Sequence, residues 1–453
     1  MDSKDLALEN SETLKHIVLD YVQMKTFIKQ PVIMKKAEGV WYEDIYGKKY
    51  LDGIAGIWVV SVGHNNSRIK KAMVDQLNRI AFAPPLQSTT PSALELAKEI
   101  AKITPGDINT VKFFSGGSEA TEAAIAMARQ YHKQTGNPGK YKIISRYLSY
   151  HGGTMGALSA TGRAEIKKPF EPLPTGFIHV FPPYCYRCPF GKAYPRCGLR
   201  CATIVQDVIE MEGASSVAAF ILEPIGSVGG ALAPPPDDYF HVLKDICSKH
   251  KVLLIFDEVI TGFGRTGEMF AAQTFHTVPD IICMGKGMSG GYAPLAAIAF
   301  RDYIADAFWG EDGRQFARGH TYGGNPLSAA AGLACIQEIK RLNLCQKAKE
   351  MGEYLKQRLN DLRELGVVGD VRGKGLMVAV EFVRDQACKE PFPNELAFGK
   401  LIAERALRNG LFVRATPHIM SLGPPLIIEK EEIDLMVGIL RKSTEDIVSR
   451  VKR

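Results

Sequence analysis

A chain of 453 residues with 46% hydrophobic side chains is long enough for two or three domains with sizeable cores, which argues against extensive disorder. Its 56 basic and 49 acidic residues give a net charge of +7 without any dense basic stretch, so no nucleic-acid partner is predicted. The N-terminus lacks the apolar segment of a secretory signal, and no apolar run approaches the roughly 20 residues of a membrane span. The expected location is therefore cytoplasmic, with no membrane partner.

The predicted elements begin with a small antiparallel unit over residues 35–62, where short strand-like pieces alternate with turns. From about residue 92 the pattern changes to an alternation of helices and strands. Apolar residues at three- and four-residue steps predict helices over 91–103 and 118–134. Apolar runs predict strands within 141–146, 217–224, 251–259, 280–285 and 294–300. This order predicts an α/β fold with a mostly parallel, doubly wound sheet.

The chain after about residue 325 is predicted to form a smaller α+β unit. A long helical stretch over 325–362 precedes strand-like segments at 375–383 and 410–415 and a final amphipathic helix. The expected organisation is an N-terminal segment of the small domain at 1–70, a large domain at 71–325 with a cysteine-rich insertion at 182–201, and a C-terminal small domain at 326–453.

Four of the nine cysteines gather in the insertion, at Cys185, Cys188, Cys197 and Cys201. The pattern C-x2-C-x8-C-x3-C can supply four thiolates to one zinc ion or to an iron–sulfur cluster. Two disulfides or four reduced thiols are the alternatives, and the central spacing matches no common zinc template. The surrounding prolines and glycines place the cysteines on a loop.

Lys286 follows an apolar run in "DIICMGKG" and lies among glycines that suggest two other sites. Gly285, Gly287 and Gly290 match the dinucleotide pattern G-x-G-x-x-G, and residues 287–291 match the nucleophile elbow G-x-S-x-G around Ser289. Both motifs need a helix directly after them. The segment that follows them here contains a further glycine and a proline, which prevent a helix. A serine hydrolase stays as the alternative from a different class.

Two acidic residues follow neighbouring apolar runs in the way that Lys286 does. Asp257 ends "VLLIFD" and Glu223 ends "FILE", so parallel strands would bring both carboxylates and the lysine to one sheet edge. The glycine-rich turn at 116–118 opens a helix whose N–H groups suit a phosphate. A desolvated lysine can form a Schiff base with an aldehyde, and a carboxylate can keep a pyridine nitrogen protonated. The ligand with an aldehyde, a pyridine and a phosphate is pyridoxal 5'-phosphate.

Several segments of the chain resemble motifs of the class III aminotransferases of fold type I, in the same order. They are "YLDGIAGIW", "SGGSEA", the Tyr150–Gly152 segment "YHG", "FDEVITGFGRTG", "MGKG" and the His320–Pro326 segment "HTYGGNP". The resemblance implies a mostly parallel seven-stranded central sheet and a smaller α+β domain formed by the N- and C-terminal segments. It also implies a pyridoxal-phosphate-dependent transaminase.

The resemblance implies a role for each matching residue. Lys286 is the catalytic, cofactor-binding lysine and Asp257 the partner of the pyridine nitrogen. Thr321 is similar to a threonine that reaches the phosphate of the neighbouring subunit, which implies a homodimer with shared sites and leaves a tetramer open. The remaining cofactor-binding residues implied are Gly117, Ser118, Tyr150, His151, Glu223 and Val259.

Two departures separate the chain from the branch that acts on 4-aminobutyrate and ornithine. Val228 stands where that branch carries a glutamate, and Ile260 stands where it often carries a glutamine. The chain instead resembles the amine and ω-amino acid:pyruvate aminotransferases. In that branch a mobile arginine, matched by Arg414, binds the keto acid's carboxylate. The other substrate-binding residues implied are Trp58, Phe82, Pro85, Leu86 and Tyr150.

The reaction implied is transfer of an amino group from a primary amine or ω-amino acid to pyruvate by a ping-pong mechanism. β-Alanine, taurine and a diamine are equally acceptable donors, and the length and stereochemistry of the donor stay open. The alternatives within the family are a 4-aminobutyrate-type enzyme using 2-oxoglutarate and an aminomutase that needs no keto acid.

Overall fold

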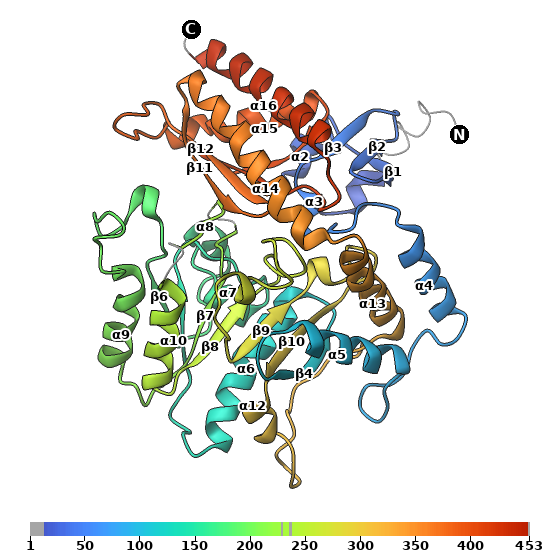
Figure 1. The fold of residues 1–453 in the computed structure, drawn as a ribbon, viewed down its shortest axis with the longest axis vertical. Coiled ribbons are helices and arrows are strands. Elements are labelled where there is room, and N and C mark those ends of the chain that lie inside the picture. The colour runs from blue at the N-terminus through green and yellow to red at the C-terminus, as the bar shows by residue number, and fades with distance from the viewer. Residues whose placement is uncertain (1–12, 228–229, 235–237, 452–453) are drawn as a thin grey trace.

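The computed structural model describes residues 13–227, 230–234 and 238–451, which form three sheets with helices packed around them (Figure 1). Within these residues, the central sheet has seven strands in the spatial order β4, β10, β9, β8, β7, β5, β6. The strands run parallel except β10, which pairs antiparallel with β4 and β9. Their bounds are β4 Ile108–Phe114, β5 Lys142–Arg146, β6 Phe177–Val180, β7 Val217–Leu222, β8 Leu253–Asp257, β9 Ile281–Met284 and β10 Ala296–Arg301. The predicted sheet is confirmed.

The central strands are covered on both faces, which explains why they read as continuous apolar runs. Helix α6 (Gly117–Gln134) packs on one face of the sheet. Along β8, Ile255 joins the apolar cluster beneath α6, whereas Leu254 and Phe256 join the cluster on the opposite face. Neither face of β8 meets water, so the sequence shows no polar alternation there.

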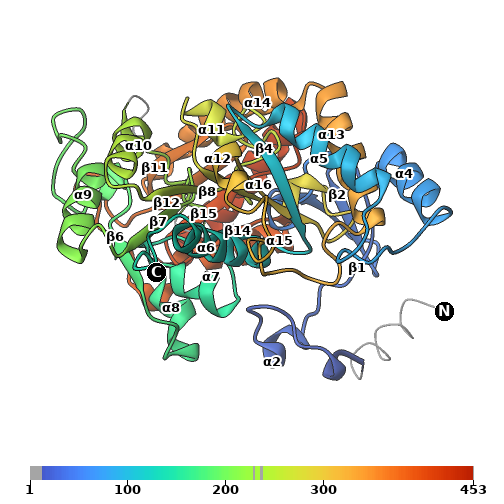
Figure 2. The ribbon, with the colours of Figure 1, turned by 90° about the horizontal axis from the view of Figure 1, so that it is seen from below.

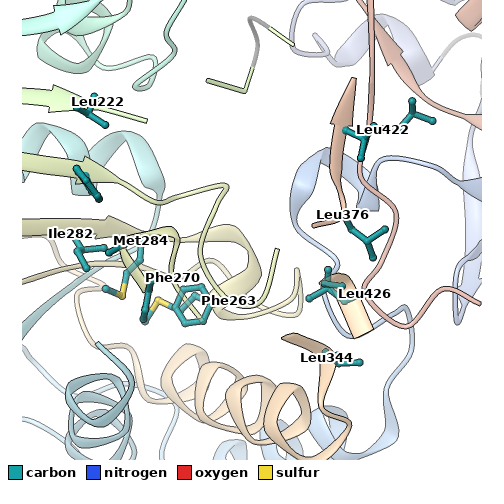
Figure 3. Close-up of a cluster of buried hydrophobic side chains, with 14 of the residues drawn as sticks. Leu222, Phe263, Phe270, Ile282, Met284, Leu344, Leu376, Leu422 and Leu426 are labelled. Atoms are coloured by element: carbon teal, nitrogen blue, oxygen red, sulfur yellow. The ribbon is translucent and has the colours of Figure 1, made fainter. Parts of the chain in front are cut away.

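One apolar cluster continues from the central sheet into the C-terminal part of the chain. Figure 3 shows Leu222, at the end of β7, and the rings of Phe263 and Phe270 facing Leu376 and Leu426 of that part. All five side chains are almost completely buried. The shared cluster fixes the C-terminal part against the edge of the sheet where Asp257 and Lys286 lie.

The two smaller sheets lie at one end of the molecule, where the N- and C-terminal segments meet (Figure 1). One has the order β1, β2, β3, β13, and β13 pairs parallel with β3. The other is antiparallel with the order β11, β12, β15, β14. The smaller domain therefore draws on both ends of the chain, and the predicted boundaries at residues 70 and 325 stay predictions. The strands are β1 Met34–Glu38, β2 Trp41–Asp44, β3 Lys49–Asp52, β11 Val368–Lys374, β12 Met377–Phe382, β13 Leu411–Phe412, β14 Arg414–Ala415 and β15 Ile419–Leu422.

The predicted helices are present, but the long helical stretch over 325–362 is two helices. Asn343 between them has a φ of 50°, a left-handed conformation that ends a right-handed helix. The longer helices are α4 Ser67–Leu77, α5 Pro91–Ile103, α9 Arg200–Glu212, α10 Tyr239–Lys249, α13 Pro326–Arg341, α14 Leu344–Asn360, α15 Phe398–Arg408 and α16 Lys430–Val451. The short ones are α2 Met24–Phe27, α3 Ala55–Trp58, α7 Met155–Ala160, α8 Ala164–Lys167, α11 Ala271–Thr274 and α12 Asp302–Asp306. In the part of the chain that the structure describes, no helix combines the length and apolar character needed to cross a bilayer.

Candidate active site

Three ionisable side chains meet at the carboxyl edge of the central sheet. Asp257 ends β8, Glu223 directly follows β7, and Lys286 opens a short 3₁₀ helix after β9. Because β7, β8 and β9 are parallel neighbours, their ends lie at one edge. Both carboxylates are close enough to Lys286 to raise the pKa of its amine. The structure thus brings together the predicted lysine and the two predicted acids.

Burial dominates the protonation behaviour of Lys286. Desolvation lowers the pKa of its amine to about 8, although Asp257 and Glu223 act in the opposite direction. The nearby guanidinium of Arg414 adds to the lowering. An appreciable fraction of Lys286 is therefore uncharged at neutral pH, as a nucleophile and proton carrier requires.

In the cofactor-free protein, acylation of Lys286 by an amine-selective reagent should reach half its maximal rate near pH 8, because only the deprotonated amine reacts. A short lysine peptide in the same reaction is the reference, with a midpoint roughly two pH units higher. Mass spectrometry of the peptide containing Lys286 measures the extent of modification. A midpoint equal to that of the reference peptide would contradict the desolvation argument.

Asp257 is held by two groups that fix the direction of its carboxylate. His151 Nδ1 lies 2.7 Å from Asp257 Oδ2, and the backbone N–H of Val259 donates to Oδ1 at 3.2 Å. His151 and Asp257 are both buried. The other ring nitrogen of His151 is also buried and has no hydrogen-bond partner within the described ranges. A buried carboxylate beside an unpaired buried ring nitrogen suits a polar ligand.

Glu223 connects two loops at the same edge. Its buried carboxylate accepts hydrogen bonds from the backbone N–H of Tyr150 at 3.0 Å and of Ser227 at 3.1 Å. Burial is the main cause that raises the pKa of this carboxyl group. The predicted Tyr150 and His151 are thereby held beside Asp257.

The N-terminus of α6 forms a seat for an anion. The backbone N–H groups of Ser115 and Gly116 donate to the Glu119 carboxylate, whereas those of Gly117 and Ser118 lie in the first turn, where no intrahelical acceptor exists. A Cβ on Gly117 would lie 2.8 Å from Val259 Cγ1, so a side chain at this position would collide with the loop after β8. Free N–H groups and the helix dipole together favour a phosphate.

Residues from both ends of the chain complete the outer side of the site. Arg414, in β14, lies close enough to Tyr150 to affect the pKa of its phenol. The sequence interpretation missed Tyr21, whose hydroxyl lies 3.4 Å from that of Tyr150. Tyr21 belongs to the stretch before β1. This stretch contains α2 and lies outside the three sheets (Figure 2). A single aromatic residue in a mixed-charge segment carries no pattern from which this position could have been predicted.

Trp58 lies in α3 and is buried beside the loops that follow β7 and β8. It belongs to an apolar cluster with Ile225, just after Glu223, and Ile260, just after Asp257. The cluster places the indole next to the edge of the sheet that carries the ionisable groups. Val228, on which the comparison with the 4-aminobutyrate branch depends, lies outside the described residues.

The remaining predicted site residues lie on the surface of the single chain. Phe82, Pro85, Leu86 and Thr321 are exposed. Their two segments pack together, since the ring of Phe82 lies 6.1 Å from that of Tyr322. The role of these residues in a site shared with a second subunit stays a prediction.

The structure gives no support for the metal site that the spacing of the four-cysteine loop suggested. Cys185, Cys188, Cys197 and Cys201 line one small pocket as free thiols. Within residues 13–227, 230–234 and 238–451, no three histidine, cysteine or acidic side chains lie where they could hold one metal ion. Burial, together with the neighbouring Cys185, Cys197 and Cys188, raises the pKa of the Cys201 thiol to about 12. The zinc and iron–sulfur predictions therefore have no support in the described residues.

The loop is attached to the smaller domain by a charged network. Tyr184 and Arg187 donate to the carboxylate of Glu381 in β12, and Arg372 in β11 donates to it at 2.7 Å. Glu381 is buried. This contact is consistent with a structural function of the loop between the two parts of the molecule.

Comparisons with known proteins identify the family of this chain. The family model of class III aminotransferases matches residues 24–443. This chain is a class III aminotransferase. An adenosylmethionine-8-amino-7-oxononanoate aminotransferase from Geobacter sulfurreducens is 38% identical to it over 96% of both chains. A putrescine–pyruvate aminotransferase from Pseudomonas aeruginosa is 35% identical over 95% of this chain and 94% of its own. The crystal structure of an (S)-enantioselective ω-transaminase from Thermomicrobium roseum superposes with a TM-score of 0.94 at 38% identity and covers 99% of both chains.

The site of the aminotransferase fits pyridoxal 5'-phosphate, the cofactor that its family indicates. An amine transaminase from an uncultivated Pseudomonas species was solved in its PLP-bound form and matches with a TM-score of 0.91 at 34% identity, over 95% of this chain and 98% of that one. Here Gly117 and Ser118 offer N–H groups to a phosphate, and Lys286 offers an amine. The buried carboxylate of Asp257 suits a protonated pyridine nitrogen.

The structure does not support a serine hydrolase, the alternative from a different class of enzyme. The hydroxyl of Ser289 is buried and donates to the carbonyl of Ala293 at 2.6 Å. The segment after it enters β10 instead of a helix. Ser289 is therefore not at the start of a helix, where the nucleophile elbow of hydrolases places its serine.

Proposed function

We propose that the aminotransferase transfers the amino group of a primary amine or ω-amino acid to pyruvate in two half-reactions with ping-pong kinetics. The observation that carries this proposal is the position of Arg414, whose guanidinium lies near both Lys286 and Tyr150. Arg414 is exposed and forms no ion pair with any residue that the structure describes. A free guanidinium beside the catalytic lysine suits the carboxylate of a keto acid. The putrescine–pyruvate relative supports pyruvate as the acceptor.

When bound, pyridoxal phosphate supplies an electron sink for the pair of electrons left after the donor carbon loses a proton. Lys286 would take that proton, because the pKa of its amine is lowered to about 8. Asp257, oriented by His151, would keep its negative charge against the ring nitrogen. Gly117 and Ser118 would bind the phosphate at the start of α6, and Tyr150 would lie beside the ring.

The donor side of the pocket is proposed to be formed by Trp58 and Tyr150, with Tyr21 added from the structure. The aminotransferase is further proposed to act in the cytoplasm as a homodimer, in which Phe82, Pro85, Leu86 and Thr321 complete the site of the other subunit. The exposure of the apolar Phe82, Pro85 and Leu86 in the single chain supports this assembly. A tetramer built from two such dimers stays open.

The test of the proposed function is formation of alanine from pyruvate by the purified holoenzyme with β-alanine, taurine, putrescine and a benzylic amine offered one at a time. Alanine in the presence of one donor supports the proposal and names the class of that donor. Glutamate formed only from 2-oxoglutarate would favour the 4-aminobutyrate-type reaction. Conversion of an amino acid without any keto acid would favour an aminomutase.

We expect Arg414→Ala to raise KM for pyruvate about 10- to 100-fold, the range of a lost charged hydrogen-bonded pair. KM for an amine donor without a carboxylate should change little, because nothing in that donor binds a guanidinium. Steady-state kinetics with both substrates varied give the two constants. Arg408→Ala, at an exposed position near the end of α15, is the matched control. An equal rise in both KM values would contradict the proposed role of Arg414.

A further inference from the structure

Gly423 lies directly after β15 and against the indole of Trp58. A Cβ built on Gly423 would overlap three ring carbons of Trp58, the third of them Cη2 at 2.8 Å. The backbone N–H of Gly423 donates to the carbonyl of Gly53 at 2.8 Å, which fixes the strand end close to α3. Gly423 does not adopt a left-handed φ, so its backbone conformation does not require glycine. The contact with Trp58 is what excludes a side chain.

The indole of Trp58 has a second fixed neighbour. The guanidinium of Arg265 lies 5.8 Å from the ring centre. Arg265 is fully buried and donates to the carbonyls of Leu376 at 3.1 Å and Pro424 at 2.6 Å, so it is held by the smaller domain. Trp58 itself has a φ of 63°, a conformation that is rare for a bulky residue and persists only where the surroundings enforce it.

An indole displaced by a side chain on Gly423 moves away from the end of β15, within an apolar cluster that surrounds the ring. That cluster contains Ile225 and Ile260, which follow the strands that end at Glu223 and Asp257. Because the ring packs with these two side chains, a shift of the ring changes the space beside the strand ends that carry Glu223 and Asp257. The space available to an amine donor therefore depends on how close the indole of Trp58 lies to the end of β15.

We propose that Gly423 is a specificity-determining residue, because its missing side chain lets the indole of Trp58 lie back against the end of β15 and leaves room for a bulky amine donor. This inference rests on the proposed function, in which Trp58 lines the donor pocket. Gly423 acts through Trp58 and is not expected to touch the substrate.

We expect Gly423→Ala to lower kcat/KM for 1-phenylethylamine at least about tenfold more than for n-propylamine, the scale of discrimination by one methyl group in an apolar pocket. The donor half-reaction of the holoenzyme, followed by its absorbance change, measures both constants without a keto acid. If the wild-type half-reaction proceeds but pyruvate yields no alanine, the acceptor assignment fails while the inference on Gly423 is still tested.

Two controls separate this role from a general loss of structure. Gly438→Ala places a methyl group in open space on α16 and should leave both donors unaffected. In a Trp58→Ala background, adding Gly423→Ala should change neither constant, because the ring that collides with the methyl group is gone. If Gly423→Ala alone does not fold, recovery of folding in the double variant supports the contact, and failure to recover overturns it.

A direct readout follows the indole itself. The chain has three tryptophans, so Trp41→Phe and Trp309→Phe together leave Trp58 as the only indole. In this background, Gly423→Ala should change acrylamide quenching of the holoenzyme's fluorescence and its emission maximum. Equal losses for small and bulky donors, or an effect of Gly423→Ala that persists without Trp58, would overturn the proposal.

Discussion

Lys286→Ala is expected to lower kcat for transamination by roughly 10³- to 10⁴-fold, towards the upper end of what a single proton-transferring side chain contributes. The physical reason is the position of this amine, which lies at the sheet edge beside Asp257 and Glu223 with its pKa lowered to about 8. Alanine removes the only group proposed to move the proton of the donor carbon. Stopped-flow absorbance of the donor half-reaction measures the loss without any contribution from the acceptor.

Lys71→Ala is the control for Lys286→Ala. Lys71 is an exposed lysine of α4 whose amine pairs with Asp75 four residues later. Its removal deletes an equal charge far from the sheet edge and should leave kcat unchanged. In the wild-type holoenzyme, borohydride reduction should leave the cofactor on the peptide that contains Lys286. Attachment to another lysine would contradict the central assignment.

Asp257→Asn is expected to lower kcat about 10²- to 10³-fold, the cost of removing one preorganised electrostatic partner from a buried site. Asparagine keeps the shape of the side chain but removes the charge that would hold the ring nitrogen protonated. The same charge raises the pKa of Lys286, so its removal should move the pKa of that amine further below 8. Transient kinetics measure the first effect, and the acylation profile of Lys286 against pH measures the second.

The neighbouring Glu258→Gln separates the role of Asp257 from that of any buried acid at this edge. The carboxylate of Glu258 accepts hydrogen bonds from the backbone N–H groups of Ala271 and Ala272 at 2.6 and 2.8 Å, at the start of α11. Burial raises its pKa to about 7, so about half of this carboxyl group is already neutral at neutral pH. Glu258→Gln should lower thermal stability but leave kcat of the folded enzyme within a few-fold. A loss of kcat equal to that of Asp257→Asn would argue against a specific role for Asp257.

The central part of the sheet could be predicted well because strands that are buried on both faces appear in the sequence as continuous apolar runs. Strands β7 and β9 are apolar throughout and β8 is apolar up to its last residue. The first polar residues that end these runs or follow them are Glu223, Asp257 and Lys286. Strands β4 and β6 were not predicted. They lie at the two ends of the sheet order, where a strand is only partly covered and its sequence mixes polar with apolar residues. Asn343 was missed because a left-handed residue between two good helices leaves no periodic signal.

The sequence by itself determined the composition of the active site. The ends of three apolar runs and the glycine turn at the start of α6 specify an amine, two acids and an anion seat, because strand ends and helix starts are local properties. Only the tertiary structure decided what surrounds them. Tyr21 and Arg414 reach Tyr150 from opposite ends of the chain, and Gly423 meets Trp58 from the opposite end of the chain. The four thiols, close in sequence, line one small pocket but are not placed to hold a metal ion in the part of the chain that the structure describes. Contacts between distant segments depend on how the sheets pack, and no local pattern of residues records them.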